Sequence, residues 1–275
     1  MGLLTLAAGF STLNVATGGT GVNSADVAFA GLSQTPGASL NFATNSLGLA
    51  GSTPRIRILG AAPVLLNNIL PWATVGGGEF ASYVPYVSAG GASSGGFGAL
   101  NAVGFAGYSQ SLGGTLTGVA ASPTANVRVT NFATPLALPA GTLGLNSLNL
   151  LANVTGGTLH FATDTDTLNL TSGGLLRSGN STSFIGTTPN NGRLTTGGTG
   201  AAVPLYIYNN QGTFTVNSRI VDNNGPLQLV LSGASAFNLA GVNSYTGGTV
   251  LNGVRSPSAT PFRARSFRRA APAWS

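Results

Sequence analysis

The stretch that decides the fold is residues 205–253, LYIYNNQGTFTVNSRIVDNNGPLQLVLSGASAFNLAGVNSYTGGTVLNG. Apolar residues in it recur two positions apart, which is the period of a strand with one buried face. These residues are Leu205 and Ile207, Phe214 and Val216, Leu227, Leu229 and Leu231, and Phe237 and Leu239. Runs of asparagine, glycine and serine separate them, and such residues tolerate the backbone angles of tight turns. The stretch predicts short strands laid end to end, each closed by a glycine or asparagine turn.

The same rhythm occurs through most of the chain. Four related hexads, TLNVAT, SLNFAT, VTNFAT and TLHFAT, occupy residues 12–17, 39–44, 129–134 and 158–163. The first two lie about 27 positions apart, a spacing that suits one coil of a repeat array of roughly 20–30 residues per coil. Strands from successive coils would then stack in parallel about 4.8 Å apart and bury an aliphatic interior. The pattern predicts an all-β solenoid over 1–254.

Two segments depart from this rhythm. Residues 85–125 are rich in glycine, serine and alanine, which predicts an irregular excursion from the array. Residues 255–275 have no strand alternation, and they contain three prolines and five arginines, which predicts a disordered basic tail. Between 61 and 84 the chain is most apolar, and Trp72 and Phe80 are expected to fill a core there.

The composition points to an exported protein with a neutral surface. Charged residues make up 6% of the 275-residue chain, against roughly 25% in an average soluble protein. The net charge of +6 comes mostly from the tail, because 1–254 contains six arginines and five acidic residues. Nucleic acid is therefore not an expected partner, since its affinity depends on clustered cations. The chain has no cysteine, which fits either a cytosolic protein or a bacterial exported protein that needs no disulfides. It also has no apolar run of 18 residues, so no membrane-spanning segment is expected.

One motif resembles a known family. Asn243, followed by Tyr245, Thr246, Gly247, Gly248 and Thr249, is similar to the autotransporter-associated β-strand repeat of bacterial passenger regions. The resemblance implies a right-handed parallel β-helix that is exported and displayed or secreted, and it implies no chemistry. The motif ordinarily continues into a further strand, but here 255–275 follows. We therefore expect that the tail is non-native sequence and that the chain is a fragment of a longer passenger, whose further repeats would be its neighbours.

A search for catalytic chemistry yields one weak candidate. Asp164 and Asp166 are two apart on a predicted strand, so their carboxylates would point the same way, as in a paired-carboxylate or weak cation site. His160 is the one histidine, so a histidine-based triad or a zinc site would lack a second imidazole. Residues 18–23, GGTGVN, approach a calcium-binding nonapeptide but carry asparagine in place of its aspartate. No cofactor and no metal site are expected.

The sequence thus favours a structural or adhesive scaffold at the bacterial cell surface, not an enzyme, with surface glycans or neighbouring cells as partners. The alternative is a carbohydrate-binding or carbohydrate-cleaving β-helix with its groove around Asp164 and Asp166.

Overall fold

The computed structural model describes residues 1–18, 24–44, 46–51, 53–88, 93–113, 121–130, 135–151, 153, 156–197 and 203–253. These residues form 23 strands and no helix, and most of the strands pair in parallel. The all-β prediction is therefore confirmed. Within the same residues there is no helix with the length and apolarity that a membrane crossing requires. The predicted tail over 255–275 lies outside the described residues.

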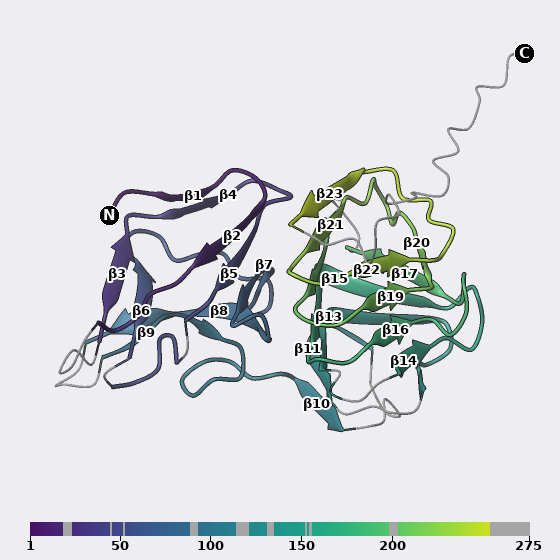
Figure 1. The fold of residues 1–275 in the computed structure, drawn as a ribbon, viewed down its shortest axis with the longest axis horizontal. Helices are drawn as coiled ribbons and strands as arrows, with labels where there is room; N and C mark the ends of the chain where they lie inside the picture. The colour runs from purple at the N-terminus through teal and green to yellow at the C-terminus, as the bar shows by residue number, and fades with distance from the viewer. Residues whose placement is uncertain are drawn as a thin grey trace, which may run out of the picture.

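The N-terminal lobe, which we define as strands β1 to β9, begins with two successive turns of chain that lie on one another (Figure 1). The first carries β1 (Leu4–Leu6), β2 (Phe10–Leu13) and β3 (Asp26–Phe29), and the second carries β4 (Leu32–Gln34), β5 (Ser39–Phe42) and β6 (Arg55–Ile58). Each strand of the first pairs in parallel with its counterpart in the second. Leu4 lies opposite Leu32, and Asp26 lies opposite Arg55. Paired positions in the two turns are therefore separated by nearly the same number of residues.

The lower end of this lobe is antiparallel, which the sequence did not predict. β7 (Leu70–Val75) adds in parallel to β5, but β8 (Glu79–Val87) and β9 (Ser94–Ala99) then turn back on it as antiparallel strands. The irregular excursion expected over 85–125 thus contains ordered strands among its described residues. Glycine is used there for close approach, because a Cβ on Gly96 would lie 2.4 Å from the carbonyl oxygen of Ile56, and one on Gly98 would overlap the ring of Phe105.

The C-terminal lobe, strands β10 to β23, contains a nine-stranded and a five-stranded sheet. The nine strands are β10 (Gln110–Gly113), β11 (Ser122–Thr130), β13 (Thr142–Leu151), β15 (Thr167–Ser178), β17 (Arg193–Thr196), β18 (Leu205–Asn209), β20 (Arg219–Ile220), β21 (Leu229–Ser232) and β23 (Thr249–Asn252). The five are β12 (Leu136–Ala137), β14 (Gly157–His160), β16 (Ser183–Ile185), β19 (Phe214–Val216) and β22 (Phe237–Leu239). All pairs in both sheets are parallel, and the chain alternates between the sheets as it rises from β10 to β23.

In-register stacks of aliphatic side chains build the core between these sheets. One stack in the nine-stranded sheet is Val127, Leu148, Leu175, Ile207 and Leu231, each at most 1% exposed. A second stack in the five-stranded sheet is Leu136, Leu159, Ile185 and Val216. Within each stack, parallel pairing brings like positions of successive strands together. Register shifts interrupt this pairing in β13 and β15, and along β15 the inward-facing positions change from Leu168 and Leu170 to Leu175.

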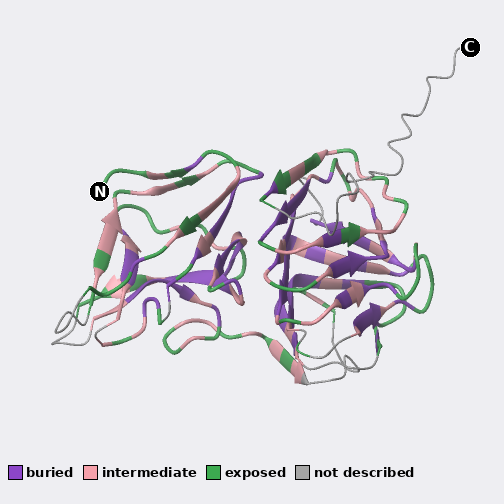
Figure 2. Ribbon diagram, viewed as in Figure 1, coloured by how far each residue is buried: buried purple, intermediate pink, exposed green. Residues whose placement is uncertain are grey.

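The two lobes lie side by side, and the outer face of the nine-stranded sheet contacts the N-terminal lobe (Figure 1). Each lobe has its own core cluster, and a third cluster, formed by Ile69, Phe80, Leu100 and Leu176, lies between them. Hydrogen bonds also cross the junction, including Ser39 Oγ to Ser232 Oγ at 2.7 Å. Exposed positions are frequent at the upper strands β1, β4 and β23 (Figure 2).

Candidate functional site

The repeat motif forms the corner between β22 and β23. Asn243 is the first anchor of this corner, because its Oδ1 accepts a hydrogen bond from the backbone N–H of Ile220 at 2.8 Å. Ile220 belongs to β20, one turn of chain earlier, so the asparagine side chain takes the place that a neighbouring backbone carbonyl would take in a ladder. The motif asparagine therefore ties the last turn of the chain to the one below it.

Asp222 is the second anchor, and it is not among the site residues predicted from the sequence. Its Oδ1 accepts the backbone N–H of Leu227 at 2.7 Å and that of Thr246 at 3.0 Å, and its Oδ2 accepts the Thr246 hydroxyl at 2.7 Å. Burial raises the pKa of the Asp222 carboxyl, but these hydrogen bonds outweigh it and leave the pKa below the ordinary value. The available signal was an aspartate directly before the turn residues Asn-Asn-Gly, where side-chain carboxylates commonly bind local backbone amides.

The two motif glycines serve different purposes. A Cβ on Gly247 would lie 2.4 Å from the carbonyl carbon of Leu227 and 2.6 Å from the nitrogen of Gln228, so this position needs the space. Gly248 has open space around it but adopts φ +83, which favours glycine. Around them the Gly247 N–H donates to the Leu227 carbonyl at 3.0 Å, and the Gly248 carbonyl accepts from the N–H of Leu229 at 2.9 Å. The Tyr245 hydroxyl meets the Thr249 hydroxyl at 2.6 Å and closes the corner.

The expectation that Asp164 and Asp166 share a strand is wrong. Both lie in a turn between β14 and β15, and the strand begins only at Thr167. The Asp166 carboxylate bends the chain there, because its oxygens accept the N–H groups of Gly141 and Thr163, each at 2.8 Å. These backbone hydrogen bonds lower the pKa of Asp166. Asp164 is exposed, and its carbonyl accepts a hydrogen bond from the Arg219 guanidinium at 2.7 Å.

The other sequence candidates do not gather around these aspartates as a metal site. His160 ends β14 with a half-buried side chain, and its carbonyl accepts the N–H of Leu138 at 2.9 Å. In the part of the chain that the structure describes, no three histidine, cysteine or acidic residues are grouped so that they could hold a metal ion. The calcium-like segment falls outside this part from residue 19 to residue 23.

A polar cluster at the lobe junction was also missed. The Glu79 carboxylate pairs with the Arg128 guanidinium at 2.9 Å and accepts the Tyr108 hydroxyl at 2.6 Å, and Asn149 Nδ2 donates to that hydroxyl oxygen at 2.8 Å. Burial raises the pKa of Glu79 despite these partners, and burial together with the Glu79 charge raises the pKa of Tyr108. The four residues are far apart in the sequence, so no local spacing marks them as a cluster.

With this geometry established, comparison with known proteins gives one partial similarity. Over 63 residues, the chain is 41% identical to the adhesin BmaC autotransporter of Brucella suis biovar 1 (strain 1330). The match covers 23% of this chain and spans 2% of that relative's length. No protein-family profile matches the chain, and no solved structure matches it.

Proposed function

We propose that this chain is part of an exported bacterial surface protein, in which a right-handed parallel β-helix acts as a structural and adhesive scaffold without catalysis. The observation that carries the proposal is the corner at 243–249, where Asn243, Thr246 and the two motif glycines bond to the preceding turn of chain. The partial similarity to an autotransporter adhesin supports the same assignment.

The scaffold role follows from how the chain is stabilised. Amide side chains and a few carboxylates bind the backbone at its corners, and the aliphatic stacks supply the burial. A scaffold of this kind can present a neutral, hydrogen-bonding surface away from the cell. Surface glycans and receptors on neighbouring cells are the partners that this surface suits.

The test is to display the chain on a non-adherent bacterium and measure attachment to glycan-coated surfaces and to cultured cells. Attachment above that of an empty display host supports the proposal. The matched control is Gly247→Ala, which disturbs the motif corner but leaves the charge unchanged. A displayed, protease-resistant chain that attaches to nothing above background refutes the adhesive role.

The carbohydrate-cleaving alternative has its own test. The double variant Asp164→Ala, Asp166→Ala removes both carboxylates that a groove there would use. Loss of saccharide cleavage or binding in this variant, with the fold intact by circular dichroism, would replace the scaffold proposal. Asp166 is already engaged by two backbone N–H groups, so we expect no change beyond a loosened turn.

A further inference from the structure

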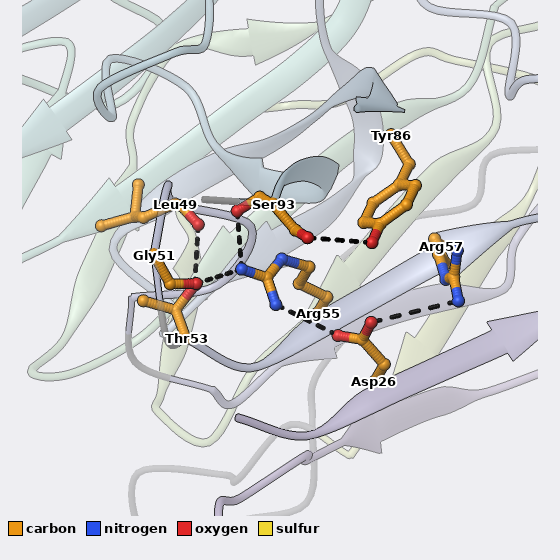
Figure 3. A network of polar contacts seen from close by, with 8 residues as sticks. All are labelled: Asp26, Leu49, Gly51, Thr53, Arg55, Arg57, Tyr86 and Ser93. Atoms are coloured by element: carbon orange, nitrogen blue, oxygen red, sulfur yellow. Dashed lines mark hydrogen bonds and ion pairs between the residues drawn. The ribbon is translucent and has the colours of Figure 1, made fainter. Parts of the chain in front are cut away.

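A charged cluster lies on the N-terminal lobe, on the side away from the C-terminal lobe, where β3 and β6 run in parallel (Figure 1). Asp26 begins β3, and Arg55 and Arg57 point outward from β6, whose Ile56 and Ile58 enter the core. Figure 3 shows the three side chains next to one another, with Tyr86 from the end of β8 approaching Arg57. The side chains of Arg57 and Asp26 are 27% and 33% exposed.

The two terminal nitrogens of Arg55 are bound within the fold, whereas its Nε has no hydrogen-bond partner among the described residues. Its side chain is 4% exposed, and its Nη1 lies 3.3 Å from Asp26 Oδ1. Its Nη2 donates to the carbonyls of Gly51 and Ser93. Because a buried guanidinium needs such partners, Arg55 and Asp26 together form a neutral structural pair.

Arg57 points to the same side of β6 as Arg55, but its guanidinium lacks hydrogen-bond partners within the described part of the chain. Its guanidinium stacks 4.3 Å from the centre of the Tyr86 ring, and the nearest carboxylate contact, Nη2 to Asp26 Oδ2, is 4.0 Å long. No hydrogen bond joins this guanidinium to another described residue. Tyr86 is itself fixed, because its hydroxyl meets Ser93 Oγ at 3.1 Å. The cluster therefore carries one positive charge in excess, on a planar group that is held in place and 27% exposed.

We propose that Arg57 and Tyr86 form a binding site for the carboxylate group of an acidic saccharide. A guanidinium offers two parallel N–H donors that match a carboxylate, and stacking on an aromatic ring reduces the entropy lost when it binds. A single excess charge suits one carboxylate per sugar unit better than a densely charged polyanion, which requires clustered cations. The inference rests on the proposed adhesive function and names its ligand class. A weak site of this kind gains avidity when many copies meet a repeating polysaccharide.

The experiment uses the full chain in isothermal titration calorimetry with an oligosaccharide of uronic acid residues and its carboxyl-reduced, neutral counterpart. We expect binding of the acidic form that weakens with added salt and no binding of the neutral form. Arg57→Gln is expected to weaken binding by roughly tenfold or more, which corresponds to about 1.4 kcal/mol. Arg193→Gln, which removes a half-buried arginine from β17 in the other lobe, is the matched control and should leave the affinity unchanged.

Two further variants make the outcome decisive. Tyr86→Phe keeps the ring and should retain affinity within about twofold, whereas Tyr86→Ala removes the stacking and should weaken binding as Arg57→Gln does. Equal affinity of Arg57→Gln and wild type, or equal binding of the neutral oligosaccharide, overturns the proposal. Acetate that competes as well as the oligosaccharide, carboxylate for carboxylate, overturns its saccharide part.

The same variants separate this inference from the proposed function. If the displayed chain attaches to cells and Arg57→Gln attaches equally well, the saccharide site is wrong and the adhesive role stands. If the wild-type chain attaches to nothing, the adhesive role fails, and calorimetry still decides whether Arg57 binds a carboxylate.

Discussion

The sharpest prediction concerns the two adjacent glycines of the motif, which should respond differently to the same change. In Gly247→Ala the new Cβ would begin 2.4–2.6 Å from backbone atoms of Leu227 and Gln228, about 1 Å inside an ordinary carbon contact. Relief of that overlap must move the corner outward by a similar amount. The Gly247 N–H to Leu227 carbonyl bond and the Leu229 N–H to Gly248 carbonyl bond, now 3.0 and 2.9 Å, would then exceed hydrogen-bond length.

Two lost backbone hydrogen bonds cost about 2 kcal/mol. Gly248→Ala meets no atom but keeps a left-handed φ, which costs about 1 kcal/mol. The free energy lost in Gly247→Ala cannot exceed the free energy needed to detach β23 from its sheet, so we expect the effect to be local. Hydrogen–deuterium exchange on peptides covering 245–253 measures it, and we expect roughly 30-fold faster exchange in Gly247→Ala and roughly fivefold in Gly248→Ala. Equal acceleration of exchange in both variants, or a larger one in Gly248→Ala, would refute the reasoning. That reasoning holds that Gly247 is needed because a side chain has no room there, and Gly248 because of its backbone conformation.

Leu175→Ala should lower the free energy of unfolding in urea by about 2–5 kcal/mol, whereas Leu251→Ala, at the same stack position but 48% exposed, should cost about 1 kcal/mol or less. Equal costs would contradict the stacked core. The raised pKa of Glu79 means that the folded protein binds this proton more tightly than the unfolded chain, so its contribution is present in acid and lost as pH rises through the folded pKa. The unfolding free energy of wild type relative to Glu79→Gln should therefore be larger at pH 4 than at pH 7, and a difference that is flat or grows with pH would contradict it. Phe80→Ala, which empties a junction position that is 1% exposed, should cost about 3–5 kcal/mol and speed exchange in β15, while unchanged exchange there would count against a packed junction.

Local patterns were enough to predict the strands over 205–253, but not those between 85 and 125 and not every turn. The two-residue alternation at 205–253 marks the positions that the structure buries, such as Leu229 and Leu231. The same alternation was extended to Asp164 and Asp166, where it failed. Aspartate and threonine side chains can satisfy nearby backbone amides, and in 163–166 this competes successfully with strand formation. At β9 the glycine content predicts irregular structure, but the structure has an ordered strand. Gly96 and Gly98 are ordered there because they pack closely against Ile56 and Phe105.

The candidate sites show a similar division. The role of Gly247 and Gly248 at a corner follows from the motif itself, since a diglycine next to a strand indicates a tight turn. The cluster around Glu79 and the stacking of Arg57 on Tyr86 do not, because in each case residues from strands that are not paired with each other meet only in the folded chain.

The sequence indicates part of the division into two lobes, through runs of adjacent apolar residues within strands. Leu175 and Leu176 are adjacent and both fully buried, as are Leu229, Val230 and Leu231. In a sheet with one solvent face, neighbouring residues point to opposite sides, so such continuous apolar runs require cover on both faces. Parity therefore indicates that the outer face of the nine-stranded sheet is covered. It does not identify the cover, because Phe80 reaches Leu176 through tertiary packing between segments almost a hundred residues apart. An outer face that must be covered can be inferred from a single sequence, whereas the segment that covers it depends on the path of the whole chain.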